Sequence, residues 1–559
     1  MRSRSIVACL VAFGVLVVWL YALGHRLPYM DQIPVFDADL ITAEARMWAR
    51  MWWDEGPLKL WFSTPLAPRS IETPTMAARG IYESWPTGAF VPIYLVAKFL
   101  GVEPSVPMVN WINVVQHGLI ALTAAFIAFQ LAVLNRLGNL SSGLIAFGVS
   151  LPILLSRGLV YCFSQIYDVV TAVLIYTAIF LLLEVFYYGG RSQRDKWVIT
   201  FLQLVTIGCA FFVDWLSYTL FVFWLVSRVA AGYAGVLERM SPRRVFGLLL
   251  LPISTFSAYI FWRLFTPGST GATTGAYDSI RHLIYKIMQR MNLTKDSPVS
   301  GFADVFFGEM HQDYYSRYTF PLIVISALVS LGLFVVAFRR AREAAERRSI
   351  FASMSILALV TIPFYFHMIV LYQHTYIHRW AITKAMFAYA LVPFALLPIA
   401  VFVLVRQSVG QSIAPPRRFL AGMTGLVLAG CALYYAFYVT RYDNYALRGR
   451  VNREAFLMWD NIGRHTVYKD VVVSPLLEAR PISGQVGTAY KLVHHADNFA
   501  DVDKVVQRVC GDFNVVLALP KGSEPGAFAS HEPAEVIDTG RIRLLRFASY
   551  PGKAIDCPQ

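Results

Sequence analysis

The chain has 559 residues, of which 57% are hydrophobic and only 15% are charged, and its formal net charge is +14 at pH 7. This composition is typical of a protein with many membrane spans and excludes an ordinary soluble globular protein. Excess Lys and Arg is expected in the cytoplasmic loops of such a protein. The sequence has no basic module with interleaved aromatic residues, so the charge does not indicate a nucleic-acid partner.

Apolar stretches of about 20 residues, the length that crosses about 30 Å of hydrocarbon, recur along the chain. We predict eleven transmembrane helices, at residues 6–24, 109–134, 140–156, 166–188, 197–213, 216–235, 245–265, 319–338, 350–373, 382–405 and 419–440. The apolar stretch 88–101 has 14 residues. Because that length is too short for a span, we interpret it as an interfacial or re-entrant segment.

The distribution of basic residues supports this count. If Arg2 and Arg4 lie in the cytoplasm, eleven spans place every short basic loop on the cytoplasmic side, as the positive-inside rule requires. The same arrangement places the long loops 25–108 and 266–318 outside. We therefore expect a multi-pass protein of the bacterial inner (plasma) membrane, with a cytoplasmic N-terminus and a periplasmic C-terminal domain.

Residues 1–440 are predicted to form the membrane domain, and the polar tail 441–559 a small extracytoplasmic α/β domain. Strand-like and helix-like runs alternate in this tail, which favours an α/β fold. The strand-like runs are Val471–Ser474, Val515–Leu519 and Arg541–Arg546, and the helix-like runs are Asn452–Ile462 and Val502–Val509. Cys510 and Cys557 lie in the same tail, where a location outside the cytosol would permit a disulfide.

Three acidic residues, Asp31, Asp37 and Asp39, follow the first predicted span. The next residues form an amphipathic, Trp-rich pattern that is typical of a helix lying at the membrane interface. One aspartate of the Asp37–Asp39 pair is expected to cap this helix, since Asp is a favoured capping residue. A further carboxylate just above the membrane would suit a general base acting on an acceptor hydroxyl or amine.

Two more aspartates lie within apolar runs, Asp168 in SQIYDVVTAV and Asp214 in CAFFVDWLSY. A charged residue in a membrane segment costs free energy and by default indicates a functional site. Both lie near the predicted outer end of a span, where that cost is small. Asp214 has the alternative interpretation of a turn residue, and Asp168 is the stronger functional candidate.

A second polar cluster is the segment with His374, His378, Arg379 and Lys384. The two histidines are four residues apart and would share one face of a helix. That spacing suits a metal pair, two donors to a phosphate, or an interfacial aromatic belt. Several outer-face cations are not explained by topology, and a lipid-phosphate site would explain a cluster of them.

Nucleotide-binding, redox and hydrolase motifs (P-loop, GxGxxG, GxSxG, HExxH and CxxC) are absent from the sequence. The order of parts instead resembles the GT-C superfamily of polyprenyl-phosphate-dependent glycosyltransferases, and within it the protein O-mannosyltransferases and lipid A aminoarabinose transferases. The resemblance rests on Asp37-Ala38-Asp39 followed by Ala43-Glu44-Ala45-Arg46, on Ser84-Trp85-Pro86-Thr87-Gly88 followed by Val91-Pro92-Ile93-Tyr94, and on Asp168.

The resemblance implies an enzyme that transfers a sugar from a polyprenyl-phosphate donor, with inversion, to a lipid, polysaccharide or protein acceptor of the envelope. It implies that Asp37 or Asp39 deprotonates the acceptor and that Asp168 orients the acceptor or the sugar. The residues expected to bind substrate or phosphate are Asp31, Arg79, Arg281, Lys286, His374, His378, Arg379 and Lys384.

A divalent ion is used by some relatives, so a metal requirement stays open, although the residues alone predict no metal ligands. Two other classes of protein fit the sequence less well than the enzyme. A lipid or sugar transporter or flippase would be expected to show internal repeats and polar groups near mid-membrane, which this sequence lacks. A non-catalytic scaffold presenting the tail would not need acids and cations at one face.

Overall fold

The structure is a computed structural model. It describes residues 2–30, 39–66, 69, 75–190, 192–294, 319–409, 462, 465–466, 470–475, 493–496, 499–506, 513–540 and 542–547. The chain divides into two compact units. The first comprises Met1–Met30, Asn110–Tyr259 and His282–Ala446, and the second comprises Asp31–Val109, Ile260–Arg281 and Leu447–Gln559.

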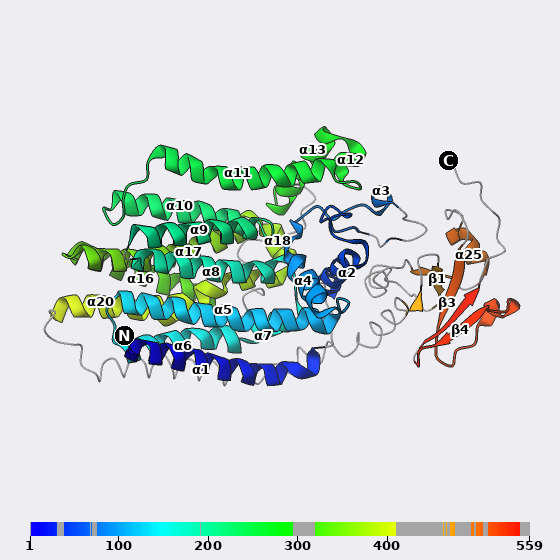
Figure 1. Cartoon of the computed structure of the whole chain (residues 1–559), viewed down its shortest axis with the longest axis horizontal. Coiled ribbons are helices and arrows are strands. Elements are labelled where there is room, and N and C mark those ends of the chain that lie inside the picture. Colours follow the sequence, from blue (N-terminus) through cyan, green and yellow to red (C-terminus); the bar gives the residue numbers. More distant parts are fainter. Residues whose placement is uncertain are drawn as a thin grey trace. The chain divides into compact units, whose positions relative to one another are not determined.

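The first unit is built from long apolar helices that lie side by side (Figure 1). They are α1 (Arg2–Arg26), α5 (Val106–Leu134), α6 (Asn139–Leu155), α8 (Val169–Gly189), α9 (Gln193–Phe211), α10 (Leu216–Tyr233), α11 (Pro242–Phe265), α16 (Thr319–Arg340), α17 (Ala344–Val370) and α20 (Leu397–Val409), and the nine-residue helix α7 (Arg157–Gln165) follows α6. Short elements complete the unit: η1 (Leu27–Tyr29), α18 (Tyr372–Ile377), η3 (Arg379–Ala385), α19 (Met386–Leu391) and η4 (Val392–Leu396). The main packing pairs are α8 with α9, α1 with α6, α10 with α17, and α16 with α20.

These helices confirm a polytopic helical membrane protein. Within the described residues, eight helices are long and apolar enough to cross a membrane, and the bent pair α6–α7 makes up to nine. The helix α9 matches the predicted span 197–213 but falls outside this count, since Arg194, Asp195 and Lys196 lie in its first turn. The predicted span 419–440 lies outside the described residues. The short stretch 88–101 contains the ten-residue helix α4 (Val91–Leu100).

A buried ion pair inside the bundle was not anticipated from the sequence. Arg228 of α10 donates to Glu184 of α8 at 2.6 Å, and Gln203 of α9 bonds the same carboxylate at 2.8 Å. The Trp224 indole adds a third bond to it, also at 2.8 Å. An unpaired charge among membrane helices would be costly, so this network satisfies both charges while joining three helices.

The second unit contains α2 (Asp39–Glu55), α3 (Met76–Arg79), η2 (Thr87–Phe90), α4 and α12 (Thr270–Thr274). The first residues of α13 (Ala276–Arg290) also belong to this unit. The helix α2 corrects one expectation. Trp48 and Trp52 do not form an interfacial belt, because both are buried and donate to the backbone oxygens of Pro65 and Ser63 at 2.9 and 2.7 Å. A Trp-rich amphipathic helix can pack its indoles inward when loop carbonyls accept their N–H groups.

Close packing joins the last turn of α11 and the segment that follows it to the first loop. Arg263 pairs with the carboxylate of Glu83 at 2.7 Å, and the backbone N–H of Thr270 bonds the same side chain. Gly268 has a φ of +83°, and a Cβ at this position would lie 2.3 Å from the carbonyl oxygen of Met76. Glycine is therefore required there by both backbone conformation and space.

The polar tail forms a five-stranded mixed sheet of order β2-β1-β3-β5-β4. The strands are β1 (Asp470–Ser474), β2 (Val493–His495), β3 (Asn514–Pro520), β4 (Glu535–Asp538) and β5 (Ile542–Phe547), with α25 (Phe499–Val506) and η6 (Gly526–Ser530) between them. β2, β1 and β3 are parallel, whereas β3, β5 and β4 are antiparallel. All three predicted strand-like runs are strands, which confirms the α/β domain. Cys510, Cys557 and most of the predicted helix Asn452–Ile462 lie outside the described residues.

Candidate functional site

Asp168 caps the N-terminus of α8. Its Oδ1 accepts hydrogen bonds from the backbone N–H groups of Val170 and Thr171 at 2.8 and 3.1 Å. The Thr171 hydroxyl in turn accepts from the backbone N–H of Asp168 at 3.1 Å, which completes a capping box. The spacing Asp-x-x-Thr before an apolar run is a capping signal, and it could have been recognised in the sequence.

The second oxygen of Asp168 is bound from a distant part of the chain. Trp380, in η3, donates its indole N–H to Oδ2 of Asp168 at 2.6 Å. Both residues are buried. The carboxylate thus holds a fixed orientation between the start of α8 and η3, and Trp380 is a candidate site residue that was not predicted from the sequence.

The same short helix η3 carries Lys384. Its ammonium group is buried and contacts two other buried side chains. It donates to Asp214 at 2.9 and 3.0 Å and contacts Nε2 of His367, on α17, at 2.9 Å. Oδ1 of Asp214 also accepts from the backbone N–H of Leu216 at 2.6 Å, at the start of α10. Asp214 is therefore a turn residue, as one sequence interpretation held, and also the counter-ion of Lys384.

The two predicted histidines lie together beside this network. The rings of His374 and His378 are 4.4 Å apart, and His378 lies 4.8 Å from the Trp380 ring in an edge arrangement. Burial, together with the positive charges of Arg290 and Lys384, lowers the pKa of His378 to about 3, and the pKa of His374 also falls well below its usual range. Both imidazoles are neutral at physiological pH, in a positively charged setting.

The environment of Asp168 is electrostatically distinct from that of a surface carboxylate. Burial raises the pKa of Asp168 to about 6, and the bond from Trp380, the helix N–H groups and Lys384 oppose this rise. A carboxyl group with a pKa near neutrality, close to cations and imidazoles, is typical of functional sites.

Asp168, Asp214, His374, His378 and Lys384 all come from one end of the bundle. That end is defined by the first residue of α8, the first turn of α10 and the segment that follows α17. Arg290, the last residue of α13, adds a charge that acts on both histidines. The structure therefore brings four of the predicted site residues together and adds Trp380, His367 and Arg290 to them.

The other predicted site residues have different surroundings. Asp31 and Asp37 lie outside the described residues, and Asp39 begins α2, with its side chain not described. The Arg379 side chain is likewise not described. Arg79, buried in the second unit, pairs with Glu55 at 2.8 Å. Arg281 is exposed on α13, and Lys286 of the same helix bonds Gln289 at 3.4 Å.

Glu44, on α2, belongs to one of the quoted motifs but was not assigned a role from the sequence. Its side chain is half-buried, and burial raises the pKa of this carboxyl to about 7. It is thus a second carboxyl group that titrates near neutrality.

Across the described part of the chain, no three His, Cys, Asp or Glu side chains come together as ligands for a metal ion. A three-ligand metal site built from these residue types would need at least one side chain from outside that part, such as Asp31 or Asp37.

Comparison with solved structures shows that the chain has the GT-C fold predicted from the sequence. It is similar to the oligosaccharyltransferase of Archaeoglobus fulgidus in the apo form, with a TM-score of 0.54 and 10% identity over 92% of this chain and 69% of that one. The same archaeal protein, AglB, in complex with an inhibitory peptide and a dolichol-phosphate gives 0.53 and 11% over the same shares.

ArnT from Cupriavidus metallidurans bound to undecaprenyl phosphate aligns over 97% of this chain and 98% of its own, with 13% identity and a TM-score of 0.48. At that TM-score the alignment does not by itself establish a shared fold. No protein-family model matches the sequence. No curated protein matches it either.

Proposed function

We propose that this protein is an integral membrane glycosyltransferase that moves a sugar from a polyprenyl-phosphate donor to an envelope acceptor at the outer face of the membrane, with inversion. The observation that supports this most directly is the buried Asp168, oriented by Trp380 and adjacent to the His374–His378 pair and the charge of Arg290. Such a site offers both an oriented carboxylate and donors for a leaving phosphate.

The leaving phosphate is assigned to Arg290, His374 and His378. Transfer from a prenyl phosphate builds negative charge on the departing phosphate, and fixed donors aimed at that charge stabilise the transition state. Neutral imidazoles can donate without a counter-ion of their own, and Arg290 supplies the positive charge. Nδ1 of His378 is buried and has no hydrogen-bond partner among the residues described. It is therefore suited to a ligand atom.

Lys384 has a different role in this proposal. Its ammonium group is already bound to Asp214 and His367 and is fully buried. We assign it to holding η3 in place, so that Trp380 reaches Asp168 and the histidine segment is fixed. Asp168 then orients the acceptor or the sugar, and the acceptor is deprotonated by Asp37 or Asp39 of the first loop.

Membrane orientation follows from the charge distribution. The candidate site lies at the N-terminal ends of α8 and α10. The short basic loops follow the C-terminal ends of α8, α10 and α16, at the opposite end of the bundle. The positive-inside rule then places those loops in the cytoplasm and the site at the periplasmic face of a bacterial inner membrane, with the N-terminus inside and the tail domain outside. The donor's prenyl chain would lie in lipid between spans.

A divalent ion is compatible with this chemistry but is assigned no step. A three-ligand site of His, Cys, Asp or Glu would have to include at least one side chain from outside the described residues. The assay that decides this is transfer in the presence of EDTA, followed by Mg²⁺ or Mn²⁺ addition.

The function is tested by comparing cells that produce the wild-type protein, Asp168→Asn or Arg194→Gln, since Arg194 is exposed at the start of α9, at the opposite end of the bundle. Mass spectrometry of envelope lipids, polysaccharides and proteins should reveal a sugar present with the wild type and with Arg194→Gln but missing with Asp168→Asn. A transporter or flippase would instead move prenyl-linked sugar across proteoliposomes without producing a glycosylated acceptor, and that result would refute the proposal.

A further inference from the structure

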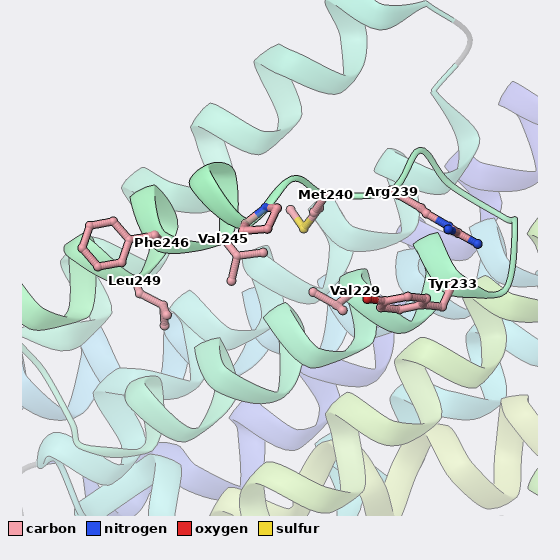
Figure 2. Close-up of a pocket in the computed structure, with 8 residues that line it drawn as sticks. Val229, Tyr233, Arg239, Met240, Val245, Phe246 and Leu249 are labelled. Carbon is pink, nitrogen blue, oxygen red and sulfur yellow. The ribbon is translucent and has the colours of Figure 1, made fainter.

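A cavity of about 380 Å³ lies between the end of α10 and the start of α11 (Figure 2). Its lining is apolar except at one side, where Arg239 is found. The lining residues are Val229, Tyr233, Arg239, Met240, Pro242, Val245, Phe246 and Leu249. This is the end of α10 opposite Asp214, so a full span of 18 residues, or roughly 27 Å of helix, separates the cavity from the candidate site.

The helix α11 packs weakly against its own unit. Only 6% of its most apolar stretch is buried, against 67% for α8. Its exposed apolar residues are therefore expected to contact lipid, because a membrane span is surrounded by hydrocarbon wherever protein does not cover it. A cavity between α10 and α11 at a span end consequently opens to lipid, at the level where headgroups begin.

Arginines are concentrated in the loop before α11 and at the start of that helix, although only Arg239 lines the cavity. Arg239 lies over the Tyr233 ring with its guanidinium carbon 5.5 Å from the centroid, and Arg244 lies 5.1 Å from the Trp197 ring. Arg243 is exposed beside them. Within the described ranges, these three arginines form no ion pair with a carboxylate. Guanidinium groups that no carboxylate neutralises attract phosphate at a membrane surface.

The loop that carries Arg239 is closely fitted to α10. A Cβ on Gly232 would lie 3.1 Å from the Cα of Arg239 and 3.4 Å from the carbonyl oxygen of Glu238. Gly235, with φ of +69°, makes the turn. The two glycines let the chain fold back so that Arg239 lies above Tyr233, as Figure 2 shows.

We propose that this cavity is a binding site for an anionic phospholipid of the bilayer, distinct from the sugar-donor site. The lipid phosphate contacts Arg239, with Arg243 and Arg244 nearby. One acyl chain lies along Val245 and Leu249 of α11 and fills the gap that α11 leaves beside α10. The bound lipid would anchor α11, whose far end enters the second unit.

The test uses the full-length purified protein in nanodiscs of mixed phosphatidylglycerol and phosphatidylcholine, with retained lipid measured by native mass spectrometry. We expect the wild type to retain phosphatidylglycerol preferentially. Arg239→Gln should lower that preference by about fivefold, the effect of one basic residue on an anionic lipid. Arg194→Gln is the matched control, because Arg194 is exposed at the same end of the bundle, on α9, and does not line the cavity.

A second variant, Leu249→Trp, fills the apolar part of the cavity and should reduce retention of phosphatidylglycerol while leaving Arg239 in place. Equal retention of the two lipids by the wild type, or an unchanged preference in both Arg239→Gln and Leu249→Trp, would overturn the proposal. So would displacement of phosphatidylglycerol by undecaprenyl phosphate in an Arg239-dependent way, since the cavity would then be a donor site.

Discussion

The indole N–H of Trp380 lies 2.6 Å from Oδ2 of Asp168, a hydrogen bond between residues 212 positions apart in the chain. It joins the capped start of α8 to η3, the short helix that also carries Lys384. Because the histidine pair directly precedes η3, this bond sets the position of a carboxylate relative to the groups proposed to hold phosphate.

Removing either partner of this bond should reduce sugar transfer. Asp168→Asn replaces an acceptor by an amide and should lower the rate by about a hundredfold, the scale of a lost catalytic carboxylate. Trp380→Phe removes one bond to a charged group, worth about 1.5–3 kcal/mol, and should lower the rate at least about tenfold. Initial rates in membranes, normalised to protein amount, measure both effects. The double variant should be no slower than Asp168→Asn, and additive losses would show that the residues act separately.

The Asp214–Lys384 pair should be required for stability more than for donor binding. Lys384→Met leaves a buried aspartate unpaired, which costs about 3–5 kcal/mol. The thermal unfolding midpoint of the detergent-solubilised protein should fall clearly, and the double variant Asp214→Asn/Lys384→Met should recover much of the loss. If Lys384→Met instead unfolds like the wild type and binds undecaprenyl phosphate poorly, Lys384 is a phosphate ligand, as the sequence alone suggested.

The pH dependence of transfer should report the titration of Asp168. Because burial raises the pKa of Asp168 to about 6, the carboxylate forms as pH rises through that value, and activity should increase between about pH 5 and pH 7. The rising limb should be absent from the residual activity of Asp168→Asn. Glu44, whose pKa is raised to about 7 by burial, is the competing origin of such a limb, and Glu44→Gln should leave it in place.

Two arginines of α13 offer a matched comparison. Arg290 acts electrostatically on His374 and His378, whereas Arg281 is exposed. Arg290→Gln should raise the KM for the prenyl-phosphate donor by about tenfold, the loss of a charge-assisted contact to phosphate. Arg281→Gln should change it little. The reverse order of effects would move the phosphate site toward the start of α13.

Gly268 should be far less tolerant of substitution than Gly275. Both have positive φ, +83° and +95°, but only Gly268 approaches backbone closely, with Met76. Gly275→Ala should cost about 1–2 kcal/mol for its conformation alone. Gly268→Ala adds a steric clash with Met76 and should cost more, seen as faster limited proteolysis of the segment that contains Met76. Equal sensitivity of the two variants would mean that the contact with Met76 is not maintained in solution.

Much of the fold could be predicted because its determinants are local. Hydrophobic length and the position of basic residues depend on neighbours in the chain, so the membrane helices and the short stretch 88–101 were recognised directly. Three of the five described strands of the tail were likewise predicted from short apolar runs, whereas β2 and β4 were not. Burial depends on distant contacts, and the inward packing of Trp48 and Trp52 was therefore missed.

The sequence by itself predicted the helical membrane fold and marked Asp168, His374 and His378 as candidate site residues, since polar groups are conspicuous in apolar runs. Only the tertiary structure decided what those groups contact. The bond from Trp380 to Asp168, the pairing of Lys384 with Asp214, and the approach of Arg290 to the histidines each join helices far apart in the chain. Such partnerships follow from how helices pack against one another, and no periodicity or spacing along one helix encodes them.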